Sequence, residues 1–306
     1  MSHFTVLVIG ENVDDQLAPF HEFECTGQND QYVQDVDVTD ELDLPENPTM
    51  EQIEDALGYY GLEDKIVDDE SKVEKVGDEC NHKYGYAIVK DGKLVKAINR
   101  TNPNRKWDWY QVGGRWSGLL RLKPGAEGEV GERSWMNRNE PSAPEFCDSA
   151  LKGDIDFEKM RQDAADEAAQ DWDDAHEIIG DRSWLTWEEV QKVITEDQGE
   201  KKVWDLRREF YHGQEALKAL RQKFDNPFLD LDKYLVPREK FIATARNTAG
   251  TTFAVLKDGQ WYEKGDMGWW GMVADEKDQD SWNEQFAKLI DDLPDDTRLT
   301  VVDCHI

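Results

Sequence analysis

The sequence predicts an α+β fold, with strands near both ends of the chain, two Trp/Gly-rich hairpin segments and a helical middle region. Three observations support this fold class. β-branched runs at Phe4 to Ile9 and Leu299 to Val302 are typical of strands. Two apolar runs lead into Asp-Gly, a strong hairpin signal. Between these hairpins, apolar residues recur every three or four positions, as on one face of a helix.

The first strand is expected to end at Gly10, and the next regular element begins only at Thr49. Thr49 and Gln52 have the spacing of a capping box, in which each side chain bonds the other residue's backbone N–H. Apolar residues then follow at helical spacing, namely Met50, Ile53, Leu57 and Tyr60. We therefore predict a short amphipathic helix that ends at Gly61.

The two expected hairpins resemble each other. Residues 86–92 read Tyr-Ala-Ile-Val-Lys-Asp-Gly, and residues 253–259 read Phe-Ala-Val-Leu-Lys-Asp-Gly. A Trp/Gly cluster follows each one, at residues 107–116 and 268–271. The likeness fits either an internal duplication or two hairpins that obey the same turn chemistry.

Helices are expected over 155–179, after a second capping box of Thr186 and Glu189, and over 201–224. Asn226-Pro227 ends the last of these. Ser281 and Glu284 predict the cap of a final helix before the closing strand.

These elements suggest four regions. Residues 1–124 hold the first strand, an acidic insertion and a Trp-rich β segment, and residues 125–150, with their Pro and Gly clusters, are the expected linker. Residues 151–240 form a helical region, and residues 241–306 form an α+β segment expected to pack with the N-terminal part.

The charge of the chain is unusually concentrated. Its formal net charge is −31 over 306 residues, and residues 11–80 alone hold 23 Asp or Glu against 3 Lys. Although 34% of residues are charged, the 12 Trp, 11 Phe and 9 Tyr exclude a wholly disordered chain. Whether residues 11–80 are ordered is left open by the sequence.

A field of one sign governs which partners can approach. It repels nucleic acid and anionic membranes, and it attracts basic protein surfaces. We therefore predict an acidic docking region, which comprises Asp35, Asp37, Asp40, Glu41, Asp43, Asp68, Asp69 and Glu70. The expected partner is a protein with a basic surface, without direct nucleic-acid binding or membrane insertion.

The second candidate site is aromatic. Its residues are Trp107, Trp109, Tyr110, Arg115 and Trp116, together with Trp269 and Trp270 of the second cluster. Aromatic platforms beside a cation can stack a nucleotide base, and basic residues surround the first cluster (Arg100, Arg105, Lys106, Arg121 and Lys123). The favoured interpretation is that the Trp side chains fill a core beside a Gly113-Gly114 bulge or tight turn.

Other chemistry finds little support. The longest apolar runs are too short to span a membrane, and residues 1–10 lack the pattern of a signal peptide. The four Cys show neither zinc nor disulfide spacing, and the clusters around His21, Cys80 and Cys304 do not match a metal motif. Nucleophile elbows and phosphate-binding loops are absent from the sequence. We expect no catalytic residue, metal or cofactor.

Three segments resemble an uncharacterised family that is common in bacteriophages and mobile elements. They are the opening MSHFTVLVIG, the central NPNRKWDWYQVGGRW of residues 102–116, and the GWWG of residues 268–271 with the closing DCHI. The resemblance leaves residues 30–80 outside any motif, and it implies a viral accessory protein in a host cytoplasm rather than any particular activity.

From charge, aromatic content and this resemblance we expect a non-enzymatic, oligomeric phage protein that binds and blocks a host protein. A DNA-acting anti-phage defence complex is the favoured target, because its DNA groove is basic; a Gabija-type nuclease–helicase complex is one example of the class. The alternative is a sponge or hydrolase for a signalling nucleotide that uses Trp107, Trp109, Arg115 and Trp116. A virion component is a weaker third hypothesis.

Overall fold

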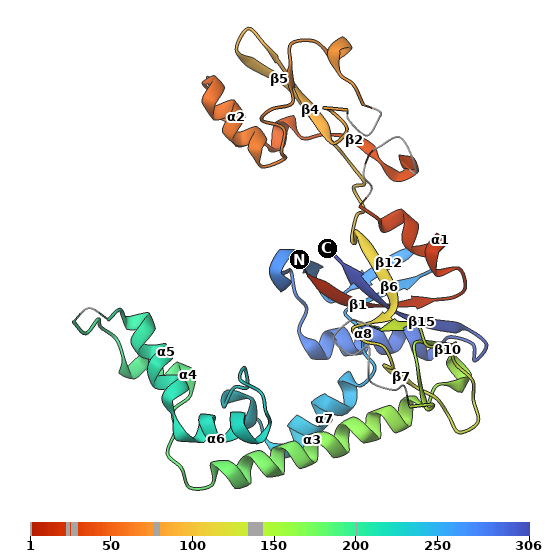
Figure 1. Ribbon diagram of the computed structural model, residues 1–306, viewed down its shortest axis with the longest axis vertical. Coiled ribbons are helices and arrows are strands. Elements are labelled where there is room, and N and C mark those ends of the chain that lie inside the picture. Colours follow the sequence, from red (N-terminus) through yellow and green to blue (C-terminus); the bar gives the residue numbers. More distant parts are fainter. Residues whose placement is uncertain (1, 23–24, 26–29, 76–79, 134–142, 200) are drawn as a thin grey trace.

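A computed structural model of the chain describes residues 2–22, 25, 30–75, 80–133, 143–199 and 201–306. It confirms the α+β class, with helices and strands in several sheets and a strand near each end. Three units are seen in Figure 1: a central sheet, a lobe of residues 30–101 that we call the acidic lobe, and a helical arm of residues 157–248.

The central sheet is built on the pairing of the first and last strands. Strand β1 (His3–Ile9) is antiparallel to β15 (Arg298–His305) along its whole length, from the His3–His305 pair to the Ile9–Leu299 pair. On the other side of β1, β11 (Ala254–Lys257) is parallel and forms a hairpin with β12 (Gln260–Glu263). Beyond β15 lie β6 (Trp109–Gly114) and β8 (Glu132–Arg133), and β10 (Ser149–Leu151) also pairs with β15.

Alternation along these strands produces two cores. One face packs Leu7, Val301 and Val255 against Trp282 and Phe286 of α8 (Gln279–Asp291). The other face packs Phe4, Val6, Val8 and Val302 against α1 (Val13–Leu17) and η1 (Ala18–Phe20). Because both faces are covered, the runs in β1 and β15 are apolar on both sides, which is why they read as continuous rather than alternating.

The acidic lobe is inserted between η1 and β6 and has its own core. Its sheet has the order β2 (Gln34–Asp37), β5 (Lys93–Thr101), β4 (Gly85–Lys90) and β3 (Ile66–Val67). Helix α2 (Met50–Gly58) begins at the predicted capping box and buries Ile53 and Leu57 against this sheet. Short 3₁₀ turns, η3 (Thr39–Glu41) and η4 (Glu70–Lys72), complete the lobe.

Both predicted hairpins are confirmed. Asp91-Gly92 joins β4 to β5, and Asp258-Gly259 joins β11 to β12. All four residues have positive φ angles, as a two-residue type I′ turn requires. The hairpins lie in different sheets, so the same turn chemistry serves two separate units.

The helical arm follows the predicted periodicity with one interruption. Helix α3 (Phe157–Ile179) and α7 (Arg238–Thr248) pack side by side, and α4 (Trp187–Val193) begins at the predicted Thr186–Glu189 box. The prediction of a single helix over 201–224 is wrong. It is two helices, α5 (Val203–Gly213) and α6 (Glu215–Lys223), because Gln214 is extended and its side-chain amide bonds the backbone of Leu185.

Two further expectations differ from the structure. Helix α8 begins at Gln279, two residues before Ser281, and its cap is Asp278, whose carboxylate accepts the Ser281 N–H. The described parts of the expected linker, 125–133 and 143–150, instead belong to the central unit. Buried Asp148 holds them there by accepting bonds from the N–H groups of Gly118 (2.5 Å) and Gly131 (2.7 Å).

The Gly113-Gly114 pair lies against two buried carboxylates. A Cβ on Gly113 would lie 2.4 Å from Asp148 Oδ2, and one on Gly114 would lie 2.4 Å from Asp303 Oδ2. Both glycines also have positive φ angles. Both positions therefore require glycine, because a Cβ would collide with the carboxylates and because the backbone has positive φ angles.

We therefore expect Gly114→Ala to lower the free energy of unfolding by about 2 kcal/mol or more, measured by urea denaturation. Gly125→Ala is the matched control, because Gly125 has φ +80 but open space around its Cβ position. Its cost should be the conformational strain alone, about 1 kcal/mol. Equal losses in the two variants would contradict the close-approach explanation.

Candidate functional site

All eight residues of the predicted docking region are exposed on the acidic lobe. Six of them nevertheless have local partners. Asp37 bonds the backbone and hydroxyl of Thr39, Glu41 accepts the Tyr60 hydroxyl, Asp68 pairs with Lys72, and Asp69 caps η4 through Ser71; Asp35 and Glu70 are described below. Asp40 and Asp43 make no side-chain hydrogen bond or ion pair with the described residues, so they remain available to a partner.

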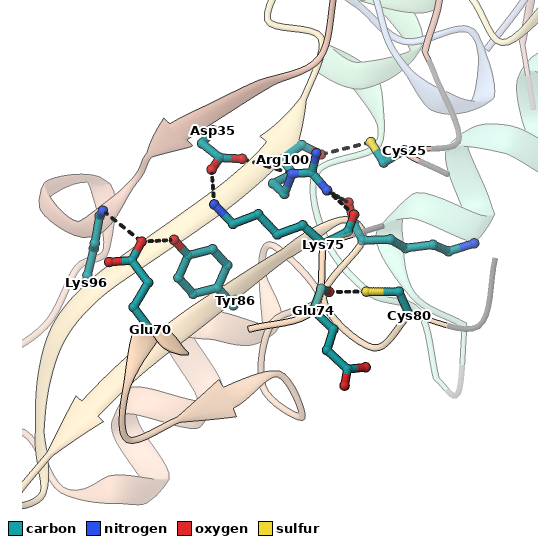
Figure 2. Close-up of polar contacts among 10 residues, drawn as sticks. Cys25, Asp35, Glu70, Glu74, Lys75, Cys80, Tyr86, Lys96 and Arg100 are labelled. Carbon is teal, nitrogen blue, oxygen red and sulfur yellow. Dashed lines mark hydrogen bonds and ion pairs between the residues drawn. The ribbon is translucent and has the colours of Figure 1, made fainter. Parts of the chain in front are cut away.

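Asp35 belongs to a network at the base of the lobe (Figure 2). One carboxylate oxygen accepts from Lys75 Nζ (2.5 Å) and the other from Arg100 Nε (2.9 Å). Arg100 also donates to the Lys75 and Lys83 carbonyl oxygens. Burial acts to raise the pKa of Asp35, but the Lys75 and Arg100 contacts outweigh it and hold that pKa below its ordinary value.

Glu70 forms a second part of the network. It accepts a hydrogen bond from the Tyr86 hydroxyl (2.8 Å) and lies 3.9 Å from Lys96 Nζ (Figure 2). Burial, and then the Glu70 contact, raise the pKa of the Tyr86 phenol. Lys96 and Arg100 follow the acidic stretch of residues 11–80 in sequence, so tertiary structure pairs acids of that stretch with bases that come after it. The lobe of residues 30–101 holds 19 acidic and 8 basic residues, a net charge of −11.

A cleft of about 1180 Å³ lies between the acidic lobe and the central sheet. Its lining includes Tyr59, Tyr84, Arg105, Asp108 and Met272. Tyr59 is 85% and Met272 is 68% exposed, which is unusual for large apolar side chains. Exposed Tyr, Met and Arg are the residue types that protein interfaces favour. The sequence analysis did not identify this cleft, because its walls come from distant segments.

The structure divides the predicted aromatic site. Trp107 is buried in the core beside α1, and Tyr110 and Trp116 pack against the two cores, as the favoured interpretation expected for Trp. Trp109 is 41% exposed and lies on the other face of the sheet from Trp107. Trp270 is 80% exposed in η7 (Trp269–Gly271), and the side chain of Trp269 lies outside the described part.

The basic residues around the first cluster are largely occupied. Their partners are Asp35 for Arg100, Glu22 for Arg105, Glu263 and Asp266 for Lys106, Asp163 for Arg121, and the Gly153 carbonyl for Lys123. Arg115 is exposed, and its backbone N–H donates to Asp303 Oδ2 (2.9 Å). A nucleotide platform made by the whole cluster is therefore not what the fold provides.

Two histidines that the sequence analysis did not propose as site residues, His3 and His305, lie beside Trp109. His3 Nδ1 is 2.8 Å from Asp303 Oδ1, and His305 Nδ1 is 2.7 Å from Asp108 Oδ1. The two imidazole centroids are 4.8 Å apart, and Trp109 stacks on His305 at 5.0 Å. Asp303 is fully buried, and Asp108 lines the cleft. The signal was present in the opening MSH and closing DCHI, but only pairing of the two ends brings them together.

The described residues contain no group of three or more metal-ligating side chains, and Glu24 of the His21 cluster lies outside them. None of the described helices is long and apolar enough to cross a membrane. Comparisons with protein-family models, curated proteins and solved structures found no match.

The Asp35 network generates a pH-dependent prediction. A carboxyl whose pKa is lowered on folding contributes stability above its unfolded value, and that contribution is lost as the pH falls through the folded value. Asp35→Asn should therefore destabilise the lobe at neutral pH, and its difference from wild type should shrink below about pH 4. The stability of the lobe is measured at each pH by urea titration with pulsed hydrogen exchange of peptides from 85–101. The exchange pulse itself is always given at one pH, so that the exchange chemistry is the same in every sample. Asp40→Asn, which removes no described contact, is the control; a pH-independent Asp35→Asn effect would contradict the assignment.

Proposed function

We propose that this protein is a phage accessory protein of the host cytoplasm that binds and blocks a host protein through the acidic lobe. The observation that carries the proposal is the placement of eight exposed carboxylates on a lobe that has its own core. Such a lobe can present negative charge to a partner without unfolding the rest of the molecule. The resemblance of the three sequence segments to a phage family supports the viral setting.

Charge and shape together favour a basic protein surface as the partner. The acidic lobe would accelerate encounter, and the exposed Tyr59 and Met272 of the cleft would supply buried anchors after docking. A DNA-acting defence complex fits this description because its DNA groove must carry exposed cations. We further propose that the protein acts as a homo-oligomer, which would multiply the acidic lobes available to one target.

The test is an affinity capture from host cells that carry a defence system. Wild type is compared with Asp40→Lys/Asp43→Lys, which reverses the two acids that have no described partner. Asp291→Lys/Asp292→Lys at the C-terminal end of α8 is the matched control, since it changes the net charge equally without touching the lobe. We expect wild type and control to capture the same host protein. Added duplex DNA should release that protein, because it competes for the basic surface.

The lobe variant should lose the partner, with an association rate reduced about 10-fold or more. Capture of no stable partner at moderate salt would contradict the proposal. Binding that is equal in both variants and insensitive to DNA would also contradict it.

A further inference from the structure

Three segments that stood out in the sequence meet at one end of the central sheet. His3 comes from the first strand, His305 and Asp303 from the last, and Asp108 and Trp109 from the start of β6. His3 pairs with His305 across β1 and β15, and His305 pairs with Trp109 across β15 and β6. Both chain ends lie side by side at the end of the central sheet that is nearest the acidic lobe (Figure 1).

The strand register brings the two imidazoles together. Ser2 and Ile306 exchange backbone hydrogen bonds of 2.8 and 3.1 Å. In an antiparallel ladder the next pair is then a non-hydrogen-bonded pair, in which side chains approach most closely. His3 and His305 are that pair, and their rings meet edge to face.

The hydrogen bonds of each ring also define which nitrogen is available. Asp303 and Asp108 hold the two Nδ1 atoms, so each ring presents Nε2. Neither Nε2 has a partner among the described residues. Neither Nε2 is among the buried side-chain N and O atoms that lack a hydrogen-bond partner in the described residues. Each Nε2 therefore keeps some solvent contact, although His305 as a whole is only 5% exposed.

We propose that His3 and His305 form a general acid–base pair that hydrolyses a phosphodiester bond in a small nucleotide. One Nε2 accepts a proton from water as the water oxygen bonds to phosphorus. The other, protonated Nε2 donates a proton to the ester oxygen as its bond to phosphorus breaks. The products are a phosphomonoester and an alcohol, and proton exchange with solvent restores the pair. Asp303 and Asp108 are positioning residues that fix the rings.

The surroundings favour a nucleotide of small size. Trp109 stacks on His305 with one face and is 41% exposed, so it offers a platform for a base. Arg115 is exposed, and its backbone N–H bonds the same Asp303 that holds His3, so its side chain starts from the neighbourhood of the pair. A net charge of −31 repels a long polyanion far more than a single nucleotide. This activity goes beyond docking by the acidic lobe and does not depend on it.

The full chain is incubated with 2′,3′- and 3′,5′-cyclic mononucleotides, cyclic dinucleotides and linear dinucleotides, and products are separated by chromatography. EDTA is included, because the proposed step uses imidazoles alone. We expect cleavage of at least one compound, with kcat/KM lowered about 10²- to 10⁴-fold in His3→Gln and in His305→Gln. His212→Gln, which changes a histidine of the helical arm, should retain the wild-type rate.

A measurement on the wild type keeps the test decisive if the histidine variants fail to fold. Imidazole C–H NMR signals of His3 and His305 should shift on addition of the cleaved nucleotide at millimolar concentration, while that of His212 should not. Trp109→Ala should raise KM more than it lowers kcat. The proposal is overturned by absence of cleavage across the panel, by unchanged rates in folded His3→Gln and His305→Gln proteins, or by cleavage without any shift of the two signals.

Discussion

The antiparallel pairing of β1 with β15 is the interaction on which the rest of the structure depends. It joins the two ends of a 306-residue chain in the middle of one sheet, and its side chains line both cores. The acidic lobe and the helical arm both lie between these strands in sequence. Closing so long a loop costs entropy that only the completed sheet returns, so formation of the central unit is expected to be slow relative to the local lobe and arm.

Two buried carboxylates stabilise the turn at the end of the central sheet. Asp148 and Asp303 lie against Gly113 and Gly114 and satisfy backbone N–H groups of the turn that follows β6. Buried carboxylates are stable only when such donors surround them. The same Asp303 orients His3, so the packing of the turn and the geometry of the histidine pair are parts of one arrangement.

In the folded acidic lobe, several of the acidic residues are paired with basic residues that lie apart from them in the sequence. The acids of residues 30–75 and the bases of residues 83–100 belong to one lobe, where Lys75 and Arg100 pair with Asp35 and Lys96 approaches Glu70. Six of the eight docking acids therefore have partners within the lobe as well as charging it. The free acids Asp40 and Asp43 lie beside partnered ones, which suits a surface that must be both rigid and attractive to cations.

The sequence by itself determined the fold class, both Asp-Gly hairpins, the capping boxes at Thr49 and Thr186 and the exposure of the docking acids, because these depend on local backbone chemistry and on the cost of burying charge. Only the tertiary structure decided the break at Gln214, the partners of Asp35, the cleft and the histidine pair. Each of these needs contacts between residues far apart in sequence, and no local pattern records which distant strand or loop will lie beside them.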